Sequence, residues 1–330
     1  MKNVFITGGA GYVGSHCAIS LLENNYRPII IDNLCNSSQS VIKKLEIITG
    51  KKIIFYKADI RNKSKIQNIF KKHHCYAVIH CAGLKAVNES IKKPISYFDN
   101  NIGATLSLLE CMKENKVFNL IFSSSATVYN ETKNKPLKET DAIGKTKNPY
   151  GTSKYLIEQI LKDMIRSDKK WNLKIARYFN PISNHSSGLI KENSKGVPNN
   201  LIPYIVNVAK KKLPFLKIFG RNYKTKDGTC VRDYIHVMDL AEGHVAMIKK
   251  INQKKGFDIY NFGTGNGTSV LEVVRAFEKQ TGIDIPFKFT KKREGDIAFS
   301  ICNTKKAKKE LNWKSNFNIY QAIEDLKKII

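Results

Sequence analysis

A glycine-rich turn near the start of the chain restricts its fold more than any other feature. NVFIT has the composition of a first strand, TGGAGYVG follows it, and SHCAISLLENN continues as a helix. Gly8, Gly11 and Gly14 fit G-x-x-G-x-x-G, and Gly9 with the last two fits G-x-G-x-x-G. Without side chains, such a turn lets the backbone approach a pyrophosphate at the helix N-terminus. Any tight turn can use glycines, so the residues that follow must decide.

Those residues favour dinucleotide binding. Asp32 closes the second predicted strand, at the distance from the glycines where an acid takes the ribose hydroxyls. Asn33 follows it, and no arginine is present there to meet a 2′-phosphate, so NAD is favoured over NADP. Asp59 ends a further strand and is expected against the adenine. On sequence alone, Asp59 fits the cap of the next helix equally well.

The first third of the chain alternates strand-like and helix-like segments. Short β-branched runs that end in Gly or Asp and are separated by helical periods are typical of βαβ units. They predict an α/β fold with a Rossmann-type, doubly wound parallel sheet. The alternation ends after LKIARYFNP, so we expect a nucleotide-binding domain over 1–180 and a smaller α/β substrate domain over 181–330. Helices are expected over 269–280 and 304–311, and part of 230–265 is expected to pack back on the first domain.

The formal net charge of +28 raises the question of nucleic-acid binding. Lysines far outnumber arginines and are spread along the chain as pairs and triples, with no aromatic-interleaved basic strip. Nucleic-acid sites are clustered and favour arginine, so these lysines are interpreted as solvated faces. We therefore expect no nucleic-acid partner.

The cysteines and the apolar runs indicate the compartment. The seven cysteines contain no C-x-x-C pair and no zinc spacing, which predicts neither a disulfide framework nor a metal site. Cys17 and Cys111 lie in apolar helical contexts and are expected to be buried. No apolar run approaches the ~20 residues needed to span a bilayer. No targeting segment opens the sequence, so we expect a cytoplasmic protein without a membrane partner.

The segment NPYGTSK sets Tyr150 four residues before Lys154 at the head of a helix. This spacing places both on one helix face. The pair fits an ordinary exposed contact, or a base in which an ammonium and a cationic nicotinamide favour the phenolate. The nucleotide motif upstream and Ser123-Ser124-Ser125 at the end of a strand favour the second interpretation. A serine hydroxyl, a phenol and a lysine beside a nicotinamide are the groups needed to oxidise an alcohol.

These motifs are similar to those of the UDP-glucose 4-epimerases, within the extended short-chain dehydrogenase/reductase family. The resemblance rests on TGGAGYVGSH, DNLCNSS, HCAGLKAVNES, FSSSATVY, NPYGTSK, RYFNP, VPNNLIPY, DGTCVRDYIHVMDLAEGH and KKREGD, and it runs to about residue 315. Asn130 and Cys230 stand where the family usually has glycine, and a left-handed backbone at Asn130 would be tolerated. The stretch over 182–196 is divergent.

The resemblance implies a set of site residues. Tyr150 would be the base and acid, Lys154 would tune it and bind ribose, and Ser125 would bind the sugar 4-hydroxyl. NAD would be held by Gly8, Gly11, Tyr12, Val13, Gly14, Asp32, Asn33, Leu34, Cys35, Asn36, Ser37, Asp59, Ile60, Cys81, Ala82, Gly83, Leu84, Lys85, Asn100, Ser125, Tyr150, Lys154 and Phe179. The substrate would be held by Ser125, Tyr150, Asn180, Asn200, Lys217, Ile218, Phe219, Arg232, Arg293, Glu294, Gly295, Asp296 and Ser300. For Arg232 and Arg293, an ion pair with Asp233 or Asp296 remains the alternative to phosphate binding.

The implied reaction interconverts UDP-glucose and UDP-galactose. C4 is oxidised transiently by bound NAD⁺, the 4-keto sugar rotates, and its other face is reduced. Ser300 stands where the family walls the hexose pocket, and its small size extends the expected substrates to the UDP-N-acetylhexosamines. A homodimer is implied through the helices that begin near Asp99 and Tyr150, which carry apolar residues beyond one stripe.

The nearest alternatives are another NAD-dependent nucleotide-sugar epimerase and a 4,6-dehydratase, and one further alternative belongs to another functional class. A nucleotide-sugar 4,6-dehydratase needs an additional acid and base, and SSSATVYN contains no carboxylate before Glu131. A catalytically silent NAD- or nucleic-acid-binding protein would need focused charge and a dispensable Tyr–Lys pair.

Overall fold

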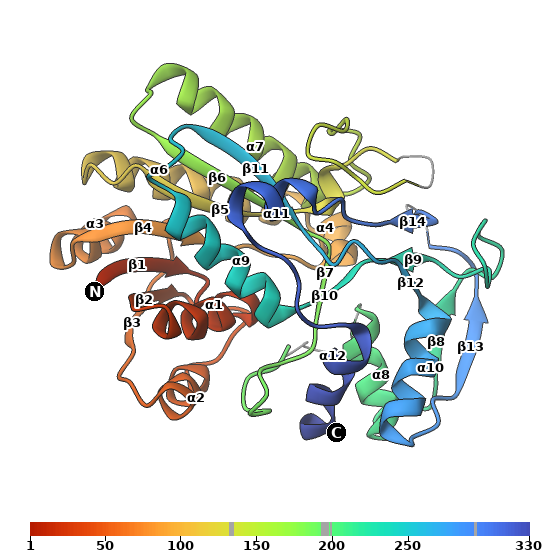
Figure 1. Ribbon diagram of the computed structural model, residues 1–330. Helices are drawn as coiled ribbons and strands as arrows, with labels where there is room; N and C mark the ends of the chain where they lie inside the picture. Colours follow the sequence, from red (N-terminus) through yellow and green to blue (C-terminus); the bar gives the residue numbers. More distant parts are fainter. Residues whose placement is uncertain (132–134, 193–197, 199, 294–295) are drawn as a thin grey trace.

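The computed structural model describes residues 1–131, 135–192, 198, 200–293 and 296–330, and its centre is a seven-stranded sheet (Figure 1). All neighbouring strands of this sheet are parallel, in the order β11-β6-β5-β4-β1-β2-β3. The strands are β1 (Lys2–Thr7), β2 (Tyr26–Asp32), β3 (Ile54–Lys57), β4 (Cys75–His80), β5 (Asn119–Ser125), β6 (Asn172–Tyr178) and β11 (Phe257–Phe262). The strand order reverses between β1 and β4, and the crevice beyond the carboxyl ends of such strands is where doubly wound sheets bind ligands.

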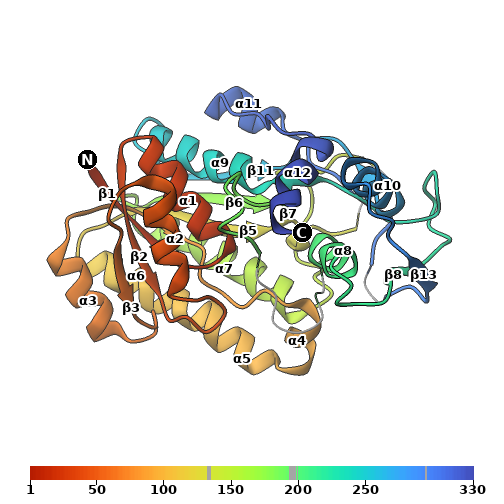
Figure 2. The same ribbon diagram turned by 90° about the horizontal axis from the view of Figure 1, so that it is seen from below.

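Helices cover both faces of the sheet, as Figure 2 shows for α9 and α11 on one side and α3 and α6 on the other. The first layer contains α1 (Tyr12–Glu23), α2 (Ser40–Thr49), α9 (Val237–Lys250) and α11 (Lys305–Leu311). The second contains α3 (Lys63–Lys72), α6 (Ala104–Glu114) and α7 (Pro149–Ser167). Each layer buries one apolar stripe, such as Leu108 and Leu109 of α6 with Ile157 and Leu161 of α7. The predicted doubly wound α/β fold is confirmed.

The region before α6 differs from the expected regular helix. The short helices α4 (Val87–Lys92) and α5 (Pro94–Phe98) lead into η1 (Asp99–Gly103), one π-helical turn that precedes α6. A second short element, the 3₁₀ turn η2 (Ala126–Val128), follows β5. Single π turns inside helices are frequent at functional sites. Asn130 has no left-handed backbone, so the expected tolerance at this position is not needed.

The rest of the chain forms small sheets with their own apolar core. The strand pairs are β7 (Asn180–Ile182) with β10 (Tyr234–His236), and β8 (Leu216–Phe219) with β13 (Phe287–Thr290). A three-stranded sheet contains β12 (Thr268–Ser269), β9 (Val231–Arg232) and β14 (Phe299–Ser300). The helices are α8 (Leu201–Ala209), α10 (Val270–Thr281), α12 (Ile319–Leu326) and the 3₁₀ turn η3 (Lys327–Ile329). The core of this part contains Ile205, Val273, Phe277 and Ile323.

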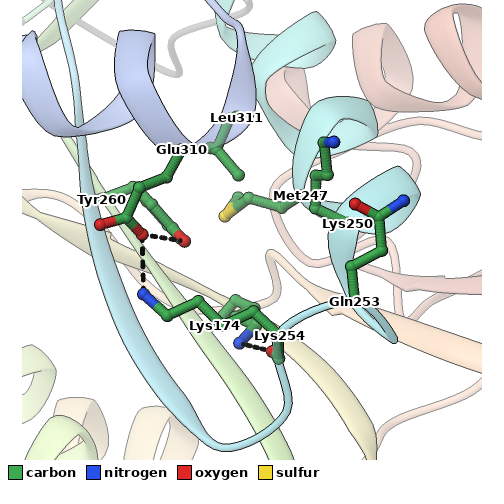
Figure 3. A pocket seen from close by; sticks show the side chains of 8 residues that line it. All are labelled: Lys174, Met247, Lys250, Gln253, Lys254, Tyr260, Glu310 and Leu311. Atoms are coloured by element: carbon green, nitrogen blue, oxygen red, sulfur yellow. Dashed lines mark hydrogen bonds and ion pairs between the residues drawn. The ribbon is translucent and has the colours of Figure 1, made fainter.

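A partly buried ionic network joins the edge of the large sheet to α11. Asp258 of β11 accepts hydrogen bonds from Lys174 at 2.6 Å and makes an ion pair with Lys254 at 2.8 Å. Glu310 of α11 pairs with Lys254 at 2.8 Å and accepts from the Tyr260 hydroxyl at 3.0 Å (Figure 3). The cavity of about 90 Å³ beside them lies near the amino ends of β6 and β11. Ligand crevices of such sheets lie at the carboxyl ends, so this network is a structural feature.

Among the described residues, no helix is both long and apolar enough to cross a membrane.

Candidate active site

The glycine turn lies between β1 and α1, as the motif predicts. Gly8 has φ +70°, and a Cβ there would lie 2.7 Å from the backbone nitrogen of Ala82. A Cβ on Gly14 would lie 2.3 Å from the carbonyl oxygen of Gly8. Neither space admits a side chain. The first turn of α1 has neither an acidic residue nor a side-chain cap, so its N–H groups are available to an anion.

Asp32 ties this turn to the loop that follows β2. Its carboxylate accepts from the backbone N–H of Ala10 at 3.0 Å and of Leu34 at 2.8 Å, and from the Ser37 hydroxyl at 2.9 Å. Leu34 has a left-handed φ of 63°, which brings its N–H back towards Asp32. The loop predicted to surround the adenosine ribose is therefore fixed by the predicted ribose ligand itself.

Asp59 does not cap the next helix, so that alternative is wrong. The cap of α3 is Asn62, whose side chain accepts from the backbone N–H of Lys65. Asp59 instead accepts from Asn33 at 3.0 Å and makes an ion pair with Arg61 at 2.8 Å. The Arg61 guanidinium holds the pKa of Asp59 well below its usual range. The ionised Asp59 thus joins the ends of β2 and β3.

The loop after β4 is held by a residue that the sequence analysis missed. Asn101, 2% exposed within the π turn, accepts from the Leu84 backbone N–H at 2.8 Å and donates to the Leu84 carbonyl at 3.1 Å. It also donates to the Ser153 hydroxyl of α7 at 3.0 Å. A Cβ on Gly83 would lie 3.2 Å from the Asn101 carbonyl oxygen and 3.7 Å from Lys154 Nζ. The π turn thereby joins the predicted cofactor loop over 81–85 to α7, and Asn100 lies beside it.

Tyr150, Lys154 and Ser125 come together at the carboxyl end of β5. Asn148 caps α7 and accepts from the Gly151 backbone N–H at 2.9 Å, which places Tyr150 in the first helical turn. The Tyr150 hydroxyl hydrogen-bonds with Ser125. Lys154 is 5% exposed, its Nζ donates to the Ser123 carbonyl at 2.7 Å, and it lies 6.0 Å from the centre of the Tyr150 ring. The alternative of an exposed Tyr–Lys pair is wrong.

Burial dominates the electrostatics of this group. Burial raises the pKa of Tyr150, and the hydrogen bond from Ser125 only partly opposes that effect. Burial also lowers the pKa of Lys154 to about 8, against the attraction of Cys81 and Glu158. The pKa of Tyr150 thus lies above its ordinary value although Lys154 is near, and the positive charge of a nicotinamide would lower it.

On the other side of the crevice, Arg232 and Ser300 are partners in a parallel strand pair. Side chains at paired positions of parallel strands lie on one face, and Phe299, next along β14, points to the other. Arg232 donates to the carbonyls of Val231 at 3.0 Å and Ile297 at 2.7 Å, and lies 3.8 Å from Asp296. Arg232 and Asp296 thus form a long ion pair, which agrees with the ion-pair alternative for Arg232.

Within the described part of the chain Asp233 has no arginine partner, so the pairing considered for it is wrong. Its carboxylate is fully buried and accepts four hydrogen bonds of 2.7–3.0 Å, from the N–H groups of Thr264, Gly265 and Cys302 and from the Thr264 hydroxyl. Its carbonyl accepts from the Asn180 backbone N–H at 2.9 Å. Asp233 therefore sets the positions of Asn180 and of the chain beside Ser300.

The remaining predicted ligands divide into two groups. Phe219 and Arg293 lie together, with the guanidinium 3.7 Å from the ring centre, and Lys217 is exposed. Ile218 and Phe179 pack in apolar cores, so only their backbones are free to face a ligand. Glu294 and Gly295 lie outside the described residues.

Glu192, which the sequence analysis did not single out, joins the two sides of the crevice. It pairs with Lys85 of the cofactor loop at 2.6 Å and accepts from Asn200 at 2.9 Å. Tyr12 of α1 makes a second contact of this kind, because its hydroxyl donates to the Ser183 carbonyl at 2.7 Å.

Comparisons with known proteins agree with this geometry. The model of the NAD-dependent epimerase/dehydratase family matches residues 4–263. The UDP-glucose 4-epimerase of Neisseria meningitidis serogroup A is 46% identical over 98% of this chain and 96% of its own. The chain belongs to the NAD-dependent epimerase/dehydratase family.

Two solved epimerases share the whole fold. The UDP-glucose 4-epimerase of Bifidobacterium longum, in complex with NAD⁺ and UDP, has a TM-score of 0.95 and 47% identity, covering 99% of this chain and 97% of its own. That of Stenotrophomonas maltophilia, with bound NAD and formylated UDP-arabinopyranose, has a TM-score of 0.96 and 42% identity, covering 98% and 96%. The resemblance inferred from the motifs is confirmed, and NAD is the cofactor of this family.

A buried ion pair that the sequence analysis also missed lies behind Tyr150 and Lys154. Glu158, one helical turn after Lys154, accepts from Arg177 of β6 at 3.0 and 2.6 Å, and both side chains are 1% exposed. Ser124, next to Ser125, donates to Glu158 at 2.5 Å. Glu158 follows Tyr150 on the same helix face, but only the fold reveals its partners.

Proposed function

We propose that the protein interconverts UDP-glucose and UDP-galactose. The observation that carries the proposal is the group formed by Tyr150, Ser125 and buried Lys154 at the carboxyl end of β5, across the crevice from the glycine turn. Its relatives with this reaction in their names match 98% of the chain. Residues 1–180 hold NAD and residues 181–330 hold the UDP sugar, with β11 and α9 returning to the first domain.

The residues at the carboxyl ends of β1 and β2 fit NAD. The backbone at Gly8 and Gly14 leaves no room for a Cβ, the N–H groups at the start of α1 suit a pyrophosphate, and Asp32 stands where a ribose would lie. When bound, NAD⁺ supplies the two-electron acceptor for sugar C4, returns those electrons in the second half of the reaction, and adds positive charge beside the phenol. The residues proposed to hold NAD are those that the resemblance implies.

The protein side of the reaction centres on Tyr150. The phenolate takes the proton of the sugar 4-hydroxyl as C4 is oxidised, and Ser125 hydrogen-bonds with the same hydroxyl. Lys154 stabilises the phenolate, because it is buried and an ion in a low-dielectric site acts strongly. Tyr150 returns the proton when the rotated 4-keto sugar is reduced.

The substrate side anchors the diphosphate and leaves the sugar free to turn. Arg232 and Arg293 suit the diphosphate because a guanidinium grips phosphate in two-point fashion. Asn180, Asn200, Lys217, Ile218 and Phe219 complete the UDP side. A 4,6-dehydratase is not supported, because η2 after Ser125 carries Ala126, Thr127 and Val128 and no carboxylate.

The deciding experiment incubates the protein with UDP-galactose and follows UDP-glucose without added cofactor. Tyr150→Phe is expected to keep the fold and the NAD content but to lose about 10²–10⁴-fold or more in kcat. Tyr155→Phe, on the same helix, is the matched control and keeps its activity. If Tyr150→Phe keeps a tenth of the parent kcat, Tyr150 is not the base.

Ser300 extends the proposed substrates to UDP-N-acetylglucosamine. Ser300 shares a strand face with Arg232, whereas Phe299 points to the opposite face. Ser300→Tyr should abolish turnover of the N-acetyl sugar and spare UDP-glucose, since exclusion of the acetyl group is a steric effect. No UDP-N-acetylgalactosamine from the parent protein, where UDP-glucose turns over readily, would contradict this extension.

A homodimer completes the proposal. Four of the apolar residues on these two helices are buried within the subunit and cannot form an interface: Leu108, Leu109, Ile157 and Leu161. The exposed apolar side chains on α4 to α7 include Ile91, Ile95, Leu106 and Leu156. Interfaces are marked by apolar side chains of this kind where they form one patch, and we propose that these four do so.

Light scattering tests the dimer directly. The parent should give twice the 37.5 kDa of one chain. Leu106→Glu should give the mass of one chain, and Ile47→Glu, which is 71% exposed on α2, should remain dimeric. A parent mass of one chain excludes the dimer.

A further inference from the structure

Two cysteines and a histidine from distant parts of the sequence meet beside the cofactor crevice. Cys17 lies on α1, Cys81 follows β4, and His244 lies on α9. One ligand atom from each lies within 4.8 Å of the other two. Cys17 and His244 are fully buried, and Cys81 is half-buried. The three residues are called the thiol–imidazole cluster below.

The hydrogen bonds of His244 prepare one ring nitrogen as a ligand. Nδ1 lies 2.9 Å from the Leu240 carbonyl, which only accepts, so Nδ1 carries the proton. Nε2 therefore holds the lone pair, and it faces the Tyr178 hydroxyl at 3.1 Å. The same hydroxyl hydrogen-bonds with Cys81, which places Nε2 on the side of the thiols. Metal-bound histidines are typically oriented in this way, by a carbonyl at the second nitrogen.

The chemistry of the cluster selects the ion. Two thiols and one imidazole are the ligands of Zn²⁺ and of softer thiophilic cations, and not of Mg²⁺ or Ca²⁺. Binding of a divalent ion releases two thiol protons, and the two thiolates then balance its charge. A neutral complex of this kind avoids the large cost of a buried net charge. Three protein ligands leave a fourth position, which the Tyr178 oxygen or a water can fill.

We propose that Cys17, Cys81 and His244 bind a thiophilic divalent cation such as Zn²⁺ or Cd²⁺, and that the bound ion inhibits the enzyme. The path for inhibition is short. Cys81 lies in the predicted cofactor loop, and its sulfur is 3.1 Å from the Ser123 hydroxyl. The carbonyl of the same Ser123 accepts from Lys154 Nζ at 2.7 Å. An ion on Cys81 fixes the position of that sulfur and changes the shape of the loop that faces NAD.

Binding is tested by titration of the full-length protein with Cd²⁺, with and without added NAD. We expect one tight equivalent, the ultraviolet charge-transfer band of a cadmium thiolate, and release of two protons. Cys17→Ala should weaken binding by at least the ~10–100-fold that loss of outer-sphere partners alone costs. His244→Gln should do the same, whereas Cys111→Ala, buried on the other face of the sheet, should bind as the parent does.

The outcomes separate this site from other causes. Equal Cd²⁺ affinity in parent and Cys17→Ala, at matched melting temperatures, overturns the site. A band that disappears in Cys35→Ser, the exposed cysteine, overturns it too and assigns the ion to that thiol. Inhibition rests on the proposed function: Cys17→Ala should keep epimerase activity and resist Zn²⁺ at least tenfold better than the parent. Tight binding without epimerase activity in the parent would refute the function and leave the metal site standing.

Discussion

Removal of the Glu158 carboxylate should destabilise the protein far more than removal of an exposed carboxylate. In Glu158→Ala, the Arg177 guanidinium, 1% exposed in the parent, loses both of its contacts with Glu158. It retains the Glu139 carbonyl at 3.2 Å and Tyr129, with whose hydroxyl it hydrogen-bonds and whose ring centre lies 4.7 Å away. An unpaired buried charge of this kind costs about 3–5 kcal/mol. Joint replacement, Glu158→Leu with Arg177→Met, should be near neutral, because the charge and its partner leave together.

Urea unfolding at a fixed NAD concentration measures this difference, since a ligand that binds only the native state adds its own stabilisation. Asp163→Ala is the matched control on the same helix. Its ion pair with Arg166 spans 2.9 Å, but the side chains are 71% and 66% exposed, so at most about 1 kcal/mol is expected. A Glu158→Ala protein within about 1 kcal/mol of the parent would refute the reasoning. So would a joint replacement that loses as much as the single one.

Two further predictions concern the pH dependence of stability and the affinity for NAD. Burial lowers the pKa of His16 and His80 to about 3 and of His236 and His244 to about 4, so between these values and about 6.5 the unfolded chain binds more protons. The unfolding free energy should therefore fall as pH falls from 6.5 to 4. The slope should exceed that of a single group, which is about 1.4 kcal/mol per pH unit. A flat profile would contradict this. Gly14→Ala should weaken NAD binding at least tenfold in a fluorescence titration, because its Cβ would lie 2.3 Å from the Gly8 carbonyl oxygen; unchanged affinity would show that the turn yields.

The features that were predictable from the sequence are those encoded by local spacing. The glycine turn, the acid at the end of β2 and the i, i+4 relation of Tyr150 and Lys154 each depend on a few consecutive residues. Alternating strand and helix periods were sufficient for the doubly wound sheet. The π turn at Asp99–Gly103 was not predictable, because its apolar pattern continues smoothly into α6.

The features that were missed depend on partners far apart in the chain. In the sequence, Asn101 has the pattern of a polar helical residue, and only the fold places it beside Leu84 and Ser153. Glu158 has the pattern of an exposed helical acid, and only the fold places Arg177 of β6 beside it. No rule of spacing joins Cys17, Cys81 and His244. The electrostatic effect of burial on Tyr150 likewise follows from packing, which a model-peptide pKa does not contain.

The two halves of the site are aligned by a carboxylate whose hydrogen-bond partners, among the described residues, include no cation. Asp233 accepts from three backbone N–H groups and one hydroxyl, although burial raises its pKa. A bond to a lysine or arginine would move with a long side chain, whereas three of these donors belong to the backbone. The same residue fixes Asn180 through its carbonyl and adjoins Arg232 in sequence. Under the proposed function, these contacts set the diphosphate side relative to β11. The proposed rotation of the sugar requires such an anchor, because the sugar can present both faces to one hydride donor only if the diphosphate stays in place.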